Sequence, residues 1–169
     1  PKTVLAWLIV AVGAPEALVG VLVPIRESGS LIPQLVIGAW VRQHPVRKGF
    51  WVFGAVLQGL AALGMALAVW LLEGLAAALV IVALLVVFSV SRGFCSVAMK
   101  DVQGKTVPKS RRGRLAGLAS TLSGLVALLV GLLLFGGNTD PELRFYSFLL
   151  LAAGLSWFVA AAVFAGVDE

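Results

Sequence analysis

Long apolar runs separated by short polar connections dominate the chain and predict membrane-spanning helices. Three runs carry no charged residue: 49–72, 115–139 and 145–167. A fourth run, 74–91, continues to about residue 99 if Arg92 is turned away from lipid. About 20 apolar residues cross a bilayer as a helix, and lipid cannot satisfy open backbone groups. We therefore expect each run to be a transmembrane helix.

The first 41 residues divide less clearly, because charges interrupt the apolar positions. In the reading we favour, the chain breaks at the turn-like segment 12–16. Residues 1–12 then end a helix whose start is missing, and 17–41 form one span with Arg26 and Glu27 inside it. This reading treats the sequence as a piece of a longer polypeptide.

A second reading crosses at 4–24 and turns at 26–30, which leaves about 12 residues for the return, too few without a re-entrant loop. Both readings give the same sidedness downstream. The favoured one predicts an all-α, polytopic transmembrane helical bundle of about six spans, the first one truncated. The spans are expected at about 1–12 (partial), 17–41, 50–72, 75–99, 115–136 and 144–166.

Composition and charge agree with a membrane protein and give its orientation. Hydrophobic residues make up 60% of the chain, charged residues only 12%, and the mean hydropathy is +1.04. Loop 42–48 carries three basic residues, and loop 100–114 carries six against one acid, Asp101. By the positive-inside rule both loops are cytoplasmic. The net charge of +5 then fits anionic lipid headgroups and not nucleic acid.

The sequence contains no residue pattern that is typical of a catalytic site or a metal site. Cys95 is the single cysteine and His44 the single histidine, which excludes a Cys/His metal site. The sequence holds no nucleophile–base set and no phosphate-binding loop. We expect no enzyme activity, no metal and no cofactor.

Both basic loops contain an ordered motif. In the first, Gly38 precedes Arg47 and Lys48 in the register of a G-x-x-x-D-R-x-G-R-R-K pattern, with Arg42 at the position of the acid. In the second, Asp101 is followed by Pro108, Arg111-Arg112-Gly113 and Gly117. These segments resemble the loop between spans two and three, and the exit of span four into span five, of the major facilitator superfamily.

The resemblance covers nearly the whole chain and implies the N-terminal six-helix half of a twelve-helix transporter. The stretches reading "PIRE" and "KDV-GK-VPK-RRGR" are also similar to little-characterised bacterial permeases of that superfamily, and this similarity implies a bacterial plasma (inner) membrane. The Gly-Pro motif of drug–proton antiporters is absent from span five. The resemblance implies a cytoplasmic gate in which Arg111, Arg112, Arg47 and Lys48 cluster around Asp101. The gate candidates are Gly38, Arg42, Arg47, Lys48, Asp101, Arg111, Arg112 and Gly113.

Four charges fall inside predicted spans: Lys2, Arg26, Glu27 and Arg92. A basic side chain at the bilayer centre costs about 2.5–3.5 kcal/mol, so such residues normally face a cavity or a partner. As neighbours on a helix, Arg26 and Glu27 point about 100° apart, and we expect Glu27 to pair with Lys2 or Arg92 instead. These residues are candidates for contact with substrate or for proton coupling, Glu27 above all. The surplus of positive charge fits an anionic substrate, acids on a missing half, or a shallower depth.

Span five carries small residues three and four positions apart, which let another helix approach closely. The expected packing positions are Gly117, Ser120, Gly124 and Gly131. The leading hypothesis is an alternating-access secondary transporter for a small solute, coupled to ions or protons, that rocks against a missing C-terminal half. The alternative is a stand-alone six-helix binding component or membrane assembly factor without a transport cycle.

Overall fold

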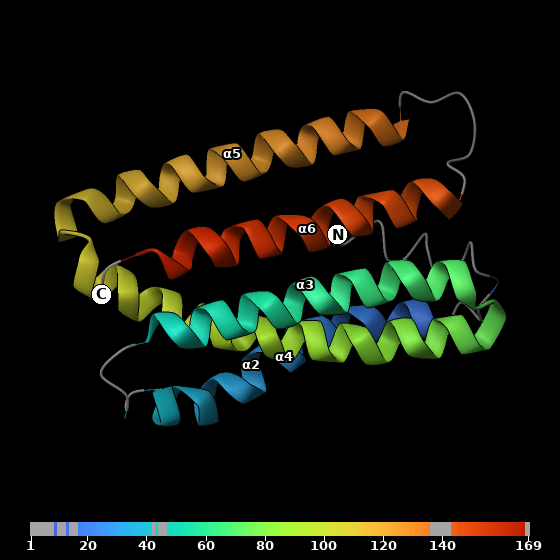
Figure 1. Ribbon diagram of the computed structural model, residues 1–169, viewed down its shortest axis with the longest axis horizontal. Coiled ribbons are helices and arrows are strands. Elements are labelled where there is room, and N and C mark those ends of the chain that lie inside the picture. The colour runs from blue at the N-terminus through green and yellow to red at the C-terminus, as the bar shows by residue number, and fades with distance from the viewer. Residues whose placement is uncertain are drawn as a thin grey trace.

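The computed structural model describes residues 9, 13, 17–41, 43, 47–135 and 143–167. Most of these residues lie in five long helices, and none of them lies in a strand (Figure 1). The helices are α2 (Ala17–Val41), α3 (Lys48–Leu71), α4 (Gly74–Thr106), α5 (Lys109–Phe135) and α6 (Leu143–Ala165). The prediction of an all-α chain is thus confirmed for the described residues. Four helices, α3 to α6, are long and apolar enough to cross a membrane, as in an integral membrane protein.

Helix α2 is continuous through the polar segment 26–30, so the reading that placed a turn there is wrong. Two prolines, Pro24 and Pro33, lie inside this helix. Proline removes one backbone donor, and membrane helices tolerate it because neighbouring groups satisfy the freed carbonyl. Helix α2 is not one of the four helices that qualify as spans by length and composition.

Helices also occupy most of the segment 100–114, which we predicted as a loop. Helix α4 continues to Thr106 and α5 starts at Lys109, so only Val107 and Pro108 lie between them. Lysine, arginine and glutamine favour helix, and no proline interrupts α4 before this point. Pro108 forces the preceding residue out of the helical region, and Val107 is extended at φ −112° and ψ 123°. The predicted loop is therefore a sharp corner between two helices.

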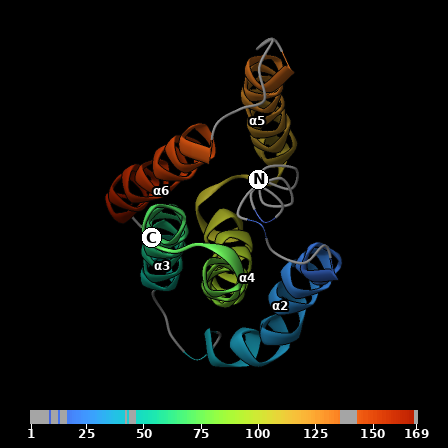
Figure 2. The ribbon, with the colours of Figure 1, turned by 90° about the vertical axis from the view of Figure 1, so that its right-hand side faces the viewer.

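Helix α3 is the centre of the described bundle, with α4 on one side and α6 on another, and α2 packs against α4 (Figure 2). Glycines mark the closest approaches. A Cβ on Gly54 would lie 2.8 Å from the Ser91 carbonyl oxygen of α4. On the other side, a Cβ on Gly59 would lie 3.2 Å from the carbonyl oxygen of Gly154 on α6. Small residues hold these helices together by letting their backbones meet.

Helix α5 stands apart from the other described helices (Figures 1 and 2). Its side chains between Leu115 and Leu129 are exposed, although nearly all of them are apolar. In a membrane protein, exposed apolar side chains face lipid or another membrane helix. Within the described residues α5 is joined to the bundle mainly through its first turn, at the corner with α4.

Candidate functional site

Most of the predicted gate residues lie at one end of the bundle, where α3 begins, α4 ends, α5 begins and α6 ends (Figure 1). We call this the basic end. Because α3 and α4 run in opposite directions, the start of one lies beside the end of the other. The fold thus brings two sequence motifs together that are separated by two complete helices.

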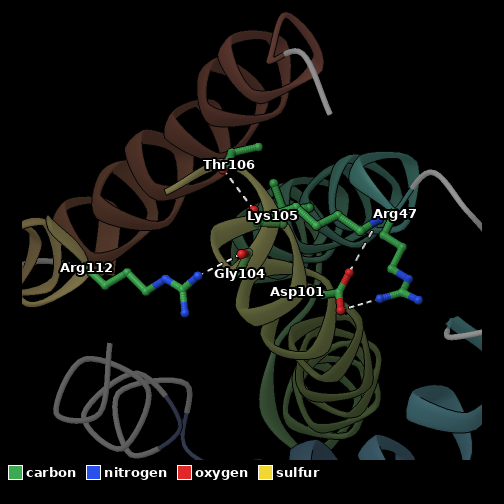
Figure 3. A network of polar contacts seen from close by, with 7 residues as sticks. Arg47, Asp101, Gly104, Lys105, Thr106 and Arg112 are labelled. Carbon is green, nitrogen blue, oxygen red and sulfur yellow. Dashed lines mark hydrogen bonds and ion pairs between the residues drawn. The ribbon is translucent and has the colours of Figure 1, made fainter. Parts of the chain in front are cut away.

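Arg47 and Asp101 form an ion pair that links the start of α3 to the end of α4 (Figure 3). The side chain of Arg47 is 16% exposed and that of Asp101 is 33% exposed. Partial burial lowers the effective dielectric constant around the pair, so the attraction is stronger than between two fully solvated charges. This ion pair joins the two resemblance motifs through charged side chains.

The second oxygen of Asp101 is poorly satisfied. Its Oδ2 atom lies 3.7 Å from Nζ of Lys105, one helical turn further along α4. It is buried and has no hydrogen-bond partner among the described residues. Asp101 therefore has capacity to accept one more hydrogen bond at the basic end.

Lys48 was expected to join Asp101 and contacts a different element. Its Nζ atom donates to the carbonyl oxygens of Val167 at 2.8 Å and Ala165 at 3.3 Å, at the end of α6. The last carbonyls of a helix lack partners inside the helix and carry partial negative charge, so a lysine stabilises them. The adjacent residues Arg47 and Lys48 thus attach α3 to two different neighbours.

Arg112 was also expected beside Asp101, and it caps the end of α4 instead. Its Nη2 donates to the carbonyl oxygen of Gly104 at 2.7 Å (Figure 3). Its Nε donates to the carbonyl oxygen of Val107 at 2.9 Å. The guanidinium thereby fixes the corner between α4 and α5. The neighbouring Arg111 and Gly113 are exposed.

Arg26 and Glu27 lie in the middle of α2, and their side chains pair at 3.4 Å between Nη2 and Oε1. Our expectation that these neighbours do not pair is wrong, because both side chains are long enough to bend toward each other across the 100° between them. Arg26 is 16% exposed, whereas Glu27 is 51% exposed. Arg92 is exposed and has no polar contact with the described residues, so it is not the partner of Glu27. Lys2, together with the gate candidate Arg42, lies outside the described residues.

The α2–α4 contact closest to these charges is also tight. A Cβ on Gly29 would lie 2.9 Å from the Cβ of Ser89 on α4. The Oγ atom of Ser89 is buried and has no hydrogen-bond partner among the described residues. A buried hydroxyl without a partner is costly in an apolar interior. Because residues three apart share one side of a helix, the side of α2 that carries Arg26 is held close to a polar position on α4.

A buried polar contact between α3 and α4 was not among the predicted site residues. Gln58 is fully buried, and its Nε2 donates to Sγ of Cys95 at 3.2 Å. The thiol of Cys95 donates in turn to the carbonyl of Trp51 at 3.4 Å. The sequence contained one indication of this contact, because Gln58 is the one strongly polar residue in the apolar run 49–72. We expected Cys95 only to fill space.

The small-residue positions of α5 have no neighbour in the described residues. Gly117, Ser120 and Gly124 are exposed, and a Cβ on Gly117, Gly124 or Gly131 would meet nothing within 4 Å. Their role in helix packing stays a prediction. Gly38, the first glycine of the gate motif, is buried on α2.

Taken together, the helices and the basic end define a membrane-embedded helical bundle with charge pairs at one end and within one helix. Neither a protein-family model, nor a curated protein, nor a solved structure matches the chain.

Proposed function

We propose that this chain is half of an alternating-access secondary transporter for a small solute, of the major facilitator type. In such a protein two six-helix halves rock about a solute site near the bilayer midplane. The proposal includes a C-terminal half outside this sequence and an orientation with the basic end in the cytoplasm of a bacterial plasma membrane.

The observation that carries the proposal is the ion pair between Arg47 and Asp101. The resemblance implies charge pairing between the first and second basic motifs, and these two residues come from those motifs. A gate that must open repeatedly needs contacts of moderate strength. A partly exposed ion pair meets this need, because water replaces the partner when the charges separate.

The Arg26–Glu27 pair supports a solute or proton site within the membrane. The pair lies near the middle of a 25-residue helix, which places it far from both ends of α2. Charges at this depth are costly and are typical of substrate and proton pathways. The exposed carboxylate of Glu27 is our candidate for proton coupling, and Arg26 for binding an anionic solute.

The direct test uses the full-length protein, reconstituted in liposomes and offered a panel of small radiolabelled solutes, anionic solutes first. Saturable binding of a solute together with its exchange across the membrane would support the transporter. Glu27→Gln is expected to abolish or weaken that exchange, whereas the matched variant Glu73→Gln, at the opposite end of α3, is not. A solute that binds with saturation and never crosses would instead favour the stand-alone binding component.

A further inference from the structure

The six basic residues of 100–114 fall into two groups with different surroundings. Lys105 contacts Asp101, and Arg112 is hydrogen-bonded to the end of α4. The other four are exposed and make no ion pair or hydrogen bond with any described residue. We call these four the cationic corner: Lys100, Lys109, Arg111 and Arg114. The fold therefore leaves four positive charges unneutralised around a single bend.

The fixed position of Arg112 determines where the arginines of the corner lie. Residues three apart share one side of a helix, so Arg111 and Arg114 lie on the same side of α5. Arg112 lies more than a quarter of a turn away around the helix and is fixed to the end of α4. Arg111 and Arg114 are consequently turned away from α4, toward the surroundings of the bundle.

The length of α4 places the corner outside the hydrocarbon layer. Its 33 residues correspond to about 50 Å of helix, whereas the hydrocarbon core of a bilayer is about 30 Å thick. The apolar part of α4 begins at its start, so the excess length projects at the basic end. The uncharged part of α5 begins only at Leu115. The four cations thus lie at the level of lipid headgroups, where both helices enter the membrane.

We propose that the cationic corner binds the phosphate groups of anionic phospholipids, with phosphatidylglycerol as the simplest representative. Arginine forms paired hydrogen bonds with phosphate oxygens, and lysine adds a point charge. No acid among the described residues of the corner competes for these groups, because Asp101 already holds Arg47 and Lys105. The two cations with protein partners, Lys105 and Arg112, are not part of the lipid site.

The test measures which lipids stay with the full-length protein. The protein is purified from nanodiscs of equimolar phosphatidylcholine and phosphatidylglycerol, and the retained lipids are counted by native mass spectrometry. The double variant Arg111→Gln/Arg114→Gln should lower the preference for phosphatidylglycerol by roughly fivefold for each cation removed. Lys105→Gln is the control, because it removes one positive charge that contacts Asp101 and leaves the hydrogen bonds of Arg112 in place, and it should leave the preference within about twofold. Equal losses in both variants would contradict the proposal.

Further measurements distinguish the loss of lipid binding from a folding defect and from the binding of free phosphate. Arg111→Lys/Arg114→Lys keeps both positive charges and should retain most of the lipid preference. Lys100→Gln/Lys109→Gln should reduce the lipid preference, and it changes only the first residue of α5. Unchanged preference in the lysine-to-glutamine variant would contradict the corner as defined. Inorganic phosphate should displace the lipid no better than sodium chloride of equal ionic strength. Selective displacement by phosphate would show a free-phosphate site and overturn the assignment to lipid.

Discussion

Arg47, at the start of α3, pairs with Asp101 near the end of α4, while the adjacent Lys48 binds the carbonyl oxygens at the end of α6. Two consecutive residues thus connect three helices at the basic end. The first connection is an ion pair and the second is a helix cap, so the two respond differently to substitution.

Removal of either partner of the ion pair should weaken the contact between α3 and α4. We expect Arg47→Gln and Asp101→Asn to destabilise the protein, and their effects should not add. A double-mutant cycle, measured by unfolding in mixed detergent micelles, should give a coupling free energy of about 1–2 kcal/mol. Lys105→Gln, which leaves Arg47 and Asp101 in place, is the control and should cost less than about 1 kcal/mol.

Replacement of Lys48 should loosen the end of α6 selectively. Lys48→Met keeps the apolar stem and removes the ammonium that caps the carbonyls of Ala165 and Val167. We expect a loss of about 1–2 kcal/mol and faster amide exchange in the last turn of α6. Exchange at the end of α4 should stay unchanged. Faster exchange of both helix ends to the same extent would mean that Lys48 supports the whole basic end.

The closest helix contact should not accept a methyl group. In Gly54→Ala the new Cβ would lie 2.8 Å from both the Cys95 Sγ and the Ser91 carbonyl oxygen. We expect a cost of about 1–3 kcal/mol, because the backbone of α4 must move. The matched change Gly117→Ala meets nothing within 4 Å and should be neutral or stabilising by up to about 1 kcal/mol. Both values come from the same detergent unfolding assay.

The small residues spaced three and four positions apart on α5 give a separate prediction for the full-length protein. If Gly117, Gly124 and Gly131 meet another membrane helix, a leucine at Gly124 would prevent close approach. We expect Gly124→Leu to lower the stability of the full-length protein by more than about 1 kcal/mol. No loss of stability would contradict this prediction and assign this face of α5 to lipid.

The ion pair between Arg26 and Glu27 should stabilise the middle of α2. Glu27→Gln keeps the shape of the side chain and removes its charge, so we expect faster amide exchange in α2 of the full-length protein. Glu73→Gln is the control, because it removes an acid that lies between α3 and α4. Unchanged exchange in Glu27→Gln would mean that the ion pair does not stabilise α2.

Hydropathy predicted much of the fold, because the bilayer imposes a long apolar run on each spanning helix. The run 17–41 is a helix in the structure, and the starts of α3 and α6 lie close to the predicted ones. The end of α4 and the start of α5 were missed for a physical reason. Charged helix formers such as Lys100 and Arg111 cannot lie in lipid, but they continue a helix in the headgroup region, so polarity alone does not mark a helix end.

The sequence predicted most of the residues that form the candidate site and only some of the contacts between them. The charged motif around Asp101 was visible in sequence, and its pairing with Arg47 follows from antiparallel α3 and α4. Lys48 and Arg112 bind carbonyl oxygens, and these acceptors exist on every residue, so side-chain types cannot reveal them. The pairing within Arg26-Glu27 was missed because helical spacing describes Cβ directions and ignores how far long side chains bend.

Alternating access is tested most directly by hydrogen–deuterium exchange on the full-length protein with Asp101→Asn. Loss of the ion pair should favour the state in which the basic end is open. Exchange should then rise around 47–50 and 100–108 and fall at the opposite end, around Leu72 and Glu73, because one end closes when the other opens. Lys105→Gln should show neither change. Increased exchange confined to the basic end would contradict the transporter, since a bundle without a transport cycle has no reason to close at the other end.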